Sequence, residues 1–174
     1  CLVMLSLMAF HATAQYSEQD LIDEANSLFE KGDYAAAMPL YSQLLSLNPT
    51  NPTFNYRFGA TALYGDAEKK EEAVKFLKFA AGKTDVDDDA WYFLGRAYHL
   101  NYLFEDAIKA YEKYKTLASK SDLDEKEVDL NIAMARSCQN LLSQIKEITV
   151  LDRKNSSEES FFRIYDLSDI GGKI

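Results

Sequence analysis

Small residues recur along this chain at a nearly constant distance, and this period constrains the fold more than any other feature. Two staggered series carry it: Ala25, Gly59 and Gly95, and then Ala37, Ala73 and Ala107. The steps are 34 and 36 positions in the first series and 36 and 34 in the second. A period of this length is typical of solenoids, in which each unit buries its apolar face against its neighbours. The chain is therefore expected to fold as three similar stacked units.

Each unit contains two amphipathic segments with apolar residues at helical spacing, for instance Ala107, Ile108, Tyr111 and Tyr114. The small number of breaking residues, seven Gly and three Pro in 174 residues, also favours helices over short strands. The expected helices span residues 20–31, 34–47, 52–64, 70–81, 88–100 and 104–118.

Proline and aspartate residues predict where some of these helices begin and end. Pro49 and Pro52 end the second helix because they cannot donate the backbone hydrogen bonds that a continuing helix needs. Asp88 or Asp89 can cap the fifth helix, accepting from its free N–H groups. Pro39 lies past the first turn of the second helix and should kink that helix or delay its start.

The third unit carries a recognisable motif, Trp91-x-x-Leu94-Gly95-x-x-Tyr98, followed by Ala107-x-x-x-Tyr111. It resembles the tetratricopeptide repeat, and the resemblance extends over residues 18–121. It implies an all-α solenoid of three helix pairs over residues 15–121. In this packing Gly95 and Ala107 leave room where paired helices cross, and the larger side chains of the motif fill the core.

The resemblance also places a set of side chains on the inner, concave face of the stack. The expected partner-binding residues are Asn26, Phe29, Tyr56, Leu63, Tyr92, Arg96 and His99, with Ile22 and Ala60 at corresponding positions. Aromatic side chains and one arginine suit the capture of an extended peptide or a partner helix. The alternative is that these side chains only cover the neighbouring repeats, because repeats bury most of their surface in stacking.

Residues 122–147 form a further expected helix, which would cap the last open face of the solenoid. Its apolar stripe contains Leu130, Met134, Cys138, Leu141 and Ile145. Cys138 is therefore expected to be a buried small hydrophobic residue rather than a reactive thiol.

Composition and motifs argue against several other classes of protein. A net charge of −9 and the lack of any basic block oppose nucleic-acid binding. The acidic run at residues 85–89 has Ala90 and Arg96 where a calcium loop needs Gly and Glu. No cluster of Cys and His suits a metal, and His99 is the only histidine outside the N-terminal segment. We expect no catalytic residue, no metal site and no cofactor.

The N-terminal residues 1–14 read as a secretory signal. A run of about ten mostly apolar residues is followed by Ala12-Thr13-Ala14, a small-x-small cleavage pattern. The run is about half of the roughly 20 residues that a transmembrane helix needs. We expect cleavage before Gln15, export to the periplasm and no transmembrane segment.

Residues 148–174 differ in character from the helical part. Strand-like "FFRIYDLS" follows a polar linker and precedes Gly171-Gly172. An exported helical repeat followed by such a segment resembles Gram-negative envelope proteins that carry tetratricopeptide repeats, a WD40-like β-propeller and an OmpA-like domain. The resemblance implies that residues 148–174 are a linker and the start of a β-propeller-like domain. It also implies a cell-envelope scaffold, associated with the outer membrane, in a peptidoglycan-anchored secretion or motility assembly.

The expected function is thus non-catalytic binding of a protein or peptide, with peptidoglycan reached only through a domain that this chain lacks. Two alternatives stay open at this point. The chain could be a free-standing periplasmic adaptor whose tail adds a strand to another protein's sheet. It could also be the regulatory arm of a downstream enzyme domain.

Overall fold

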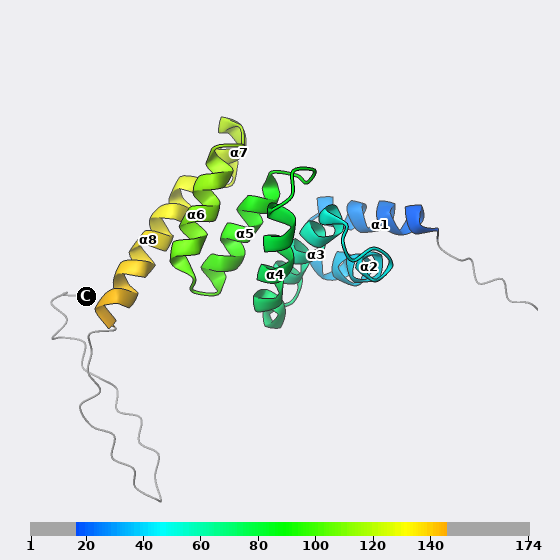
Figure 1. Cartoon of the computed structure of the whole chain (residues 1–174), viewed down its shortest axis with the longest axis horizontal. Helices are drawn as coiled ribbons and strands as arrows, with labels where there is room; N and C mark the ends of the chain where they lie inside the picture. Colours follow the sequence, from blue (N-terminus) through cyan, green and yellow to red (C-terminus); the bar gives the residue numbers. More distant parts are fainter. Residues whose placement is uncertain (1–16, 146–174) are drawn as a thin grey trace, which may run out of the picture.

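The computed structural model describes residues 17–145. The expected signal at residues 1–14 and the expected linker and β-domain start at residues 148–174 lie outside the described residues. The described part consists of helices joined by short turns (Figure 1): α1 Glu18–Glu30, α2 Tyr34–Leu47, α3 Pro52–Gly65, the short 3₁₀ helix η1 Ala67–Lys69, α4 Lys70–Ala81, α5 Asp89–Leu100, α6 Phe104–Lys115, α7 Lys120–Glu125 and α8 Val128–Ile145.

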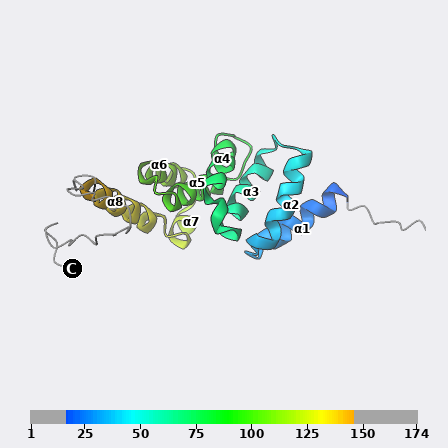
Figure 2. The same cartoon turned by 90° about the horizontal axis from the view of Figure 1, so that it is seen from below.

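The helices follow one another in a row from α1 to α8 (Figures 1 and 2). Each of α1 to α5 packs against the next helix in the chain, and α6 packs against α8. Within the described residues the fold is all-helical, with three antiparallel pairs, α1–α2, α3–α4 and α5–α6. The expected all-α solenoid of three pairs with further helical structure after them is confirmed.

Local sequence explains where the first pair begins. Ser17 caps α1 by accepting from the Asp20 backbone N–H at 3.1 Å, while the Asp20 carboxylate accepts from the Ser17 N–H. This capping box starts the helix two residues earlier than expected. Helix α2 starts at Tyr34 and continues through Pro39, so the expected delay is wrong. The carbonyl that loses its partner belongs to exposed Ala35, where water can satisfy it.

Two glycines mark the close crossings of paired helices. A Cβ on Gly59 would lie 2.6 Å from Cγ of Leu77 in α4, and a Cβ on Gly95 would lie 2.6 Å from the Tyr111 ring in α6. Leu77 and Tyr111 are completely buried. The repeating small residues therefore occur where the backbones approach, as their spacing predicted.

The cap of α5 differs from the one expected. The Asp87 carboxylate accepts from the Asp89 N–H at 2.9 Å, while Asp88 makes no capping hydrogen bond with its side chain. Asp88 already has helical dihedral angles, so its side chain is not placed to accept. The Asp89 carboxylate instead accepts from the Tyr114 hydroxyl at 2.7 Å and pairs with Lys126 at 3.2 Å. It thereby ties α5 to α6 and to the turn before α8.

The single helix expected at residues 122–147 is two helices, α7 and α8. Glu127 separates them with a φ of 48°, in the left-handed region that interrupts a right-handed helix. The Asn131 side chain donates to the carbonyls of Lys126 and Glu127 at 3.0 and 3.1 Å, and the Asn131 backbone N–H also donates to the Glu127 carbonyl at 2.9 Å. The break lets α8 turn independently of α7 and lie along α6.

The prediction for the buried side of α8 was wrong. Helix α8 contacts the stack through Val128, Asn131, Ile132 and Ala135. Three members of the expected stripe are exposed, namely Leu130, Met134 and Leu141, and Cys138 is only half-buried. Two apolar faces run along this helix, and periodicity alone cannot tell which one meets the neighbouring helices.

Candidate protein-binding face

The aromatic residues expected on the concave face divide into buried and accessible ones. Phe29 and Tyr56 are 7% and 2% exposed. Their ring centroids lie 6.0 Å apart, and Phe93 packs against both at 6.2 and 5.7 Å. The Arg57 guanidinium covers the Phe29 ring at 4.0 Å. These rings fill the space between the first helices of successive pairs, so little of their surface is available to a partner.

Asn26 and Arg96 use their polar groups inside the stack. The Asn26 Oδ1 atom accepts from the Tyr41 hydroxyl at 2.7 Å. Arg96 donates from Nε to the Tyr64 hydroxyl at 3.1 Å and from Nη1 to Asn131 Oδ1 at 2.8 Å. Arg96 thereby links α3, α5 and α8, while its half-buried side chain keeps some contact with solvent.

Tyr92 is half-buried beside α6. Its ring centroid lies 5.7 Å from that of Tyr114 and 6.1 Å from that of Tyr111, and Lys126 Nζ lies 5.9 Å from the ring centre. Burial raises the pKa of the Tyr92 hydroxyl to about 12. The hydroxyl is therefore neutral at physiological pH and can donate a hydrogen bond to a partner.

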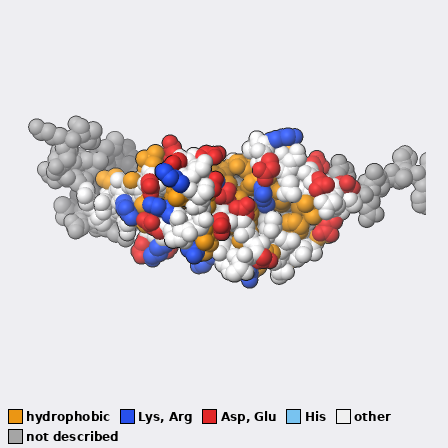
Figure 3. Space-filling view, turned by 90° about the horizontal axis from the view of Figure 1, so that it is seen from above, with side chains coloured by type: hydrophobic (Ala, Val, Ile, Leu, Met, Phe, Trp, Pro, Cys, Tyr) orange, Lys and Arg blue, Asp and Glu red, His pale blue; other side chains and the backbone are white. Residues whose placement is uncertain are grey.

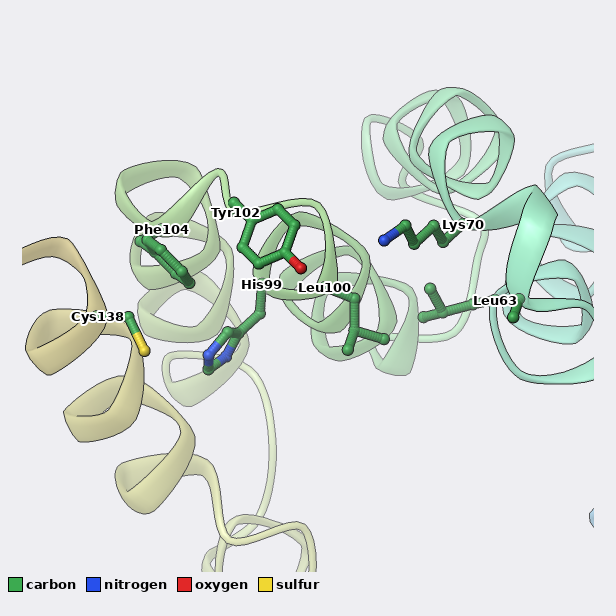
Figure 4. A pocket seen from close by; sticks show the side chains of 8 residues that line it. Leu63, Lys70, His99, Leu100, Tyr102, Phe104 and Cys138 are labelled. Carbon is green, nitrogen blue, oxygen red and sulfur yellow. The ribbon is translucent and has the colours of Figure 1, made fainter. Parts of the chain in front are cut away.

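A pocket of about 450 Å³ opens beside the C-terminal end of α5, between Leu63 of α3 on one side and Cys138 of α8 on the other (Figure 4). Its lining combines the expected site residues Leu63 and His99 with Ala67, Lys70, Leu100, Tyr102, Phe104 and Cys138. The lining is mainly apolar, and Lys70 is its one charged side chain. A pocket of this size can hold one or two side chains of a peptide.

His99 supplies the polar group on the inner wall of this pocket. Its ring packs edge-on against Phe104 at 5.5 Å and against Tyr111 at 6.4 Å. Burial, together with the positive charge of Arg96, lowers the pKa of His99. Its buried Nδ1 atom has no hydrogen-bond partner within residues 17–145. A neutral imidazole at this place can accept from or donate to an incoming polar group.

Tyr102 forms the rim of the pocket in a conformation that tyrosine rarely adopts. Its φ is 61°, and its side chain is 69% exposed. The equivalent turn of the first pair has Gly32 at a φ of 74°. A non-glycine residue in the left-handed region costs about 1–2 kcal/mol. Lys70 Nζ lies 5.4 Å from the Tyr102 ring centre, and Figure 4 shows the two side chains next to each other at the rim.

Of the pocket-lining residues, the sequence had singled out Leu63 and His99 and missed Ala67, Lys70, Leu100, Tyr102, Phe104 and Cys138. The signal for Tyr102 lies in comparing the turns, because "KGDY" in the first pair becomes "NYLF" in the third. A tyrosine at the glycine position is conspicuous in that alignment. Cys138 had no such signal, since its membership of this wall depends on how α8 is rotated.

The part of the chain that the structure describes contains neither a metal-binding cluster nor a helix suited to span a membrane. No group of three or more His, Cys, Asp or Glu side chains between residues 17 and 145 is placed to hold a metal ion. Over the same range, no helix has the length and apolar character to cross a bilayer. Figure 3 shows acidic and basic side chains interspersed on the face that it displays.

Comparison with protein families gives two matches, both described as tetratricopeptide repeat, over residues 22–51 and 60–122. Together they span just over half of the chain. A TPR repeat-containing thioredoxin, TTL4 from Arabidopsis thaliana, is 38% identical over 68 residues. That match covers 38% of this chain and only 10% of the relative, so it concerns the repeats alone.

Solved structures share the fold. The Sgt2 TPR domain from Aspergillus fumigatus matches with a TM-score of 0.56 and 21% identity, over 81% of this chain and 91% of that one. MamA from Desulfovibrio magneticus RS-1 matches with a TM-score of 0.53 and 22% identity, over 76% of this chain and 77% of that one. At such low identity the likeness concerns the arrangement of helices and not the partner.

Proposed function

We propose that this chain, which belongs to the tetratricopeptide-repeat proteins, binds a protein or peptide segment through the pocket at the C-terminal end of α5. Tetratricopeptide repeats are protein-interaction scaffolds, and the proposed role is non-catalytic. The main support for this proposal is Tyr102, an exposed aromatic residue in a strained backbone conformation at the rim of an apolar pocket. Strain of this kind concentrates at functional sites.

The pocket favours a particular kind of peptide. Leu63, Leu100 and Phe104 provide an apolar wall for one large side chain. Lys70 at the rim can pair with a carboxylate, and His99 offers one hydrogen bond from inside. We therefore propose an extended peptide with an apolar anchor next to an acidic residue as the partner. Tyr92 and Arg96 extend this surface along α5.

Leu100 is the sharpest probe of the pocket, because it lines the pocket and is 38% exposed. Peptides that bind the unmodified chain are first selected from a random displayed library. The same peptides should bind the Leu100→Asp variant at least about tenfold more weakly than the unmodified chain. Leu47→Asp is the matched control, since Leu47 is 59% exposed at the end of α2 and outside the pocket. The affinity of the Leu47→Asp variant for the same peptides should stay within about twofold of that of the unmodified chain. Titration by fluorescence anisotropy measures both affinities.

Equal affinity of both variants, or failure to select any binding peptide, would overturn the pocket proposal. Arg96 is a weaker probe, because its hydrogen bonds to Tyr64 and Asn131 join three helices. Its removal would change stability and binding together. Circular dichroism of the two leucine variants shows whether their helix content stays equal.

We further propose that the protein works in the cell envelope, exported to the periplasm and associated with the outer membrane. Support comes from the apolar run and Ala12-Thr13-Ala14 pattern, and from the likeness of the C-terminal segment to envelope proteins with propeller and OmpA-like domains. In that setting the repeats would be the interaction arm of a peptidoglycan-anchored secretion or motility assembly. Peptidoglycan itself would be bound by a domain outside this chain.

The export proposal predicts a defined mature N-terminus. Protein isolated from its source cells should begin at Gln15, because signal peptidase cuts after the second small residue. A Leu5→Asp, Leu7→Asp variant, which interrupts the apolar run, should remain unprocessed and unexported. N-terminal sequencing and cell fractionation measure this. Mature protein that retains residues 1–14 would contradict export through this signal.

A further inference from the structure

Helix α8 carries an exposed apolar surface that the solenoid does not cover. It consists of Leu130, Met134 and Leu141, which are 52%, 48% and 57% exposed and are here called the α8 face. Residues at these spacings lie along one side of a helix. The half-buried Cys138 borders the face and also lines the pocket beside His99 (Figure 4).

The α8 face is also free of charge. Only two of the 18 residues of α8, Asp129 and Arg136, are charged. Both turn toward α6, where Asp129 pairs with Lys115 and Arg136 pairs with Glu112 at 3.1 Å. A helix that ends a solenoid against water normally carries a polar outer face. Loss of charge around exposed leucines is instead typical of the centre of an interface.

In α5 the position equivalent to this surface is covered. The buried residues of α8, Val128, Asn131, Ile132 and Ala135, have the same spacing as Ala90, Phe93, Leu94 and Ala97 of α5, so Asn131 takes the place in α8 that Phe93 has in α5. Leu130 then corresponds to Tyr92. Tyr92 is half-buried by its packing beside α6 and Lys126, whereas Leu130 is 52% exposed. The surface lacks a covering layer that α5 possesses.

We propose that residues 161–167 of the same chain, "FFRIYDL", pack on the α8 face. Five of these seven residues are apolar or aromatic: Phe161, Phe162, Ile164, Tyr165 and Leu167. The 15 residues between the end of α8 and this segment can extend over about 50 Å, whereas α8 itself is about 27 Å long. The segment can therefore reach any part of the face. A short tether gives it an effective concentration of about millimolar, well above that of a separate partner.

A native thiol beside the α8 face allows a direct test. In the full chain with Cys1→Ser, Cys138 is the sole cysteine. Adding Arg163→Cys, which leaves all five apolar residues in place, should give an intramolecular disulfide with Cys138 under mild oxidation. The control Ser156→Cys lies in the polar linker and should cross-link at least about tenfold less. Tryptic digestion with mass spectrometry identifies the bridge.

A second measurement needs no new cysteine. In the Cys1→Ser chain, Cys138 should react with a thiol reagent at least about fivefold more slowly than in the same chain carrying Phe162→Ser and Ile164→Ser. Slow labelling in the first chain and a concentration-independent bridge in the Arg163→Cys chain support the proposal. Equal labelling rates, with Arg163→Cys bridging no more than Ser156→Cys, would overturn it. A Cys138–Cys138 dimer whose yield rises with protein concentration would assign the α8 face to a second copy instead.

Discussion

Replacing Tyr111 by alanine is expected to lower the free energy of unfolding by about 3 to 5 kcal/mol, as for other large aromatic side chains removed from a core. Tyr111 is completely buried and lies against Gly95 at the crossing of α5 and α6. It belongs to an apolar cluster with Ala107, Tyr114, Val128 and Ile132, and this cluster joins α6 to α8. Its loss would therefore weaken two helix contacts at once. Urea unfolding followed by circular dichroism measures the change.

Tyr111→Phe is the matched control, because it keeps the ring and removes only the hydroxyl. That hydroxyl is buried and has no hydrogen-bond partner in the described part of the chain. Its removal should change stability by less than about 1 kcal/mol or raise it, since an unpaired buried hydroxyl is unfavourable. A Tyr111→Ala protein as stable as Tyr111→Phe would show that the ring does not support the core.

The second large effect is expected at Gly95. A methyl group there would lie 2.6 Å from two carbon atoms of the Tyr111 ring, which is completely buried. Gly95→Ala should lower the free energy of unfolding by about 2 kcal/mol by overpacking, although alanine is the better helix former. Gly82→Ala is the control, because its methyl group would meet only the Lys78 and Phe79 carbonyls at 3.6 Å. That variant should stay within about 0.5 kcal/mol of the unmodified chain.

A double-mutant cycle separates the clash from any general effect of alanine. In the Tyr111→Ala background the ring is gone, so adding Gly95→Ala should cost little. The coupling between the two positions should be at least about 1 kcal/mol. Strictly additive changes in the free energy of unfolding would contradict the close contact between Gly95 and the Tyr111 ring.

Only a small part of the candidate pocket was expected from the sequence. The period of small residues located the first helices, and with them Leu63 and His99, which line the pocket. The period could not reveal that Phe29 and Tyr56 are buried by packing against Phe93. Whether an aromatic side chain at such a position is open or covered depends on the size of the residue that the next helix presents. That residue lies more than 30 positions away in the sequence.

The amino-acid sequence by itself determined the helix pairs, their order and the points where their backbones approach. These follow from the spacing of small and apolar residues, and from breaks such as Pro49 and Pro52, which act on the nearest turns of the chain. Only the tertiary structure decided the rotation of α8 and the opening of the pocket. The two faces of α8 are similarly apolar, so the choice came from fit against α5 and α6. There the Arg96–Asn131 hydrogen bond and the two ion pairs to α6 are satisfied only with Leu130 and Met134 outward.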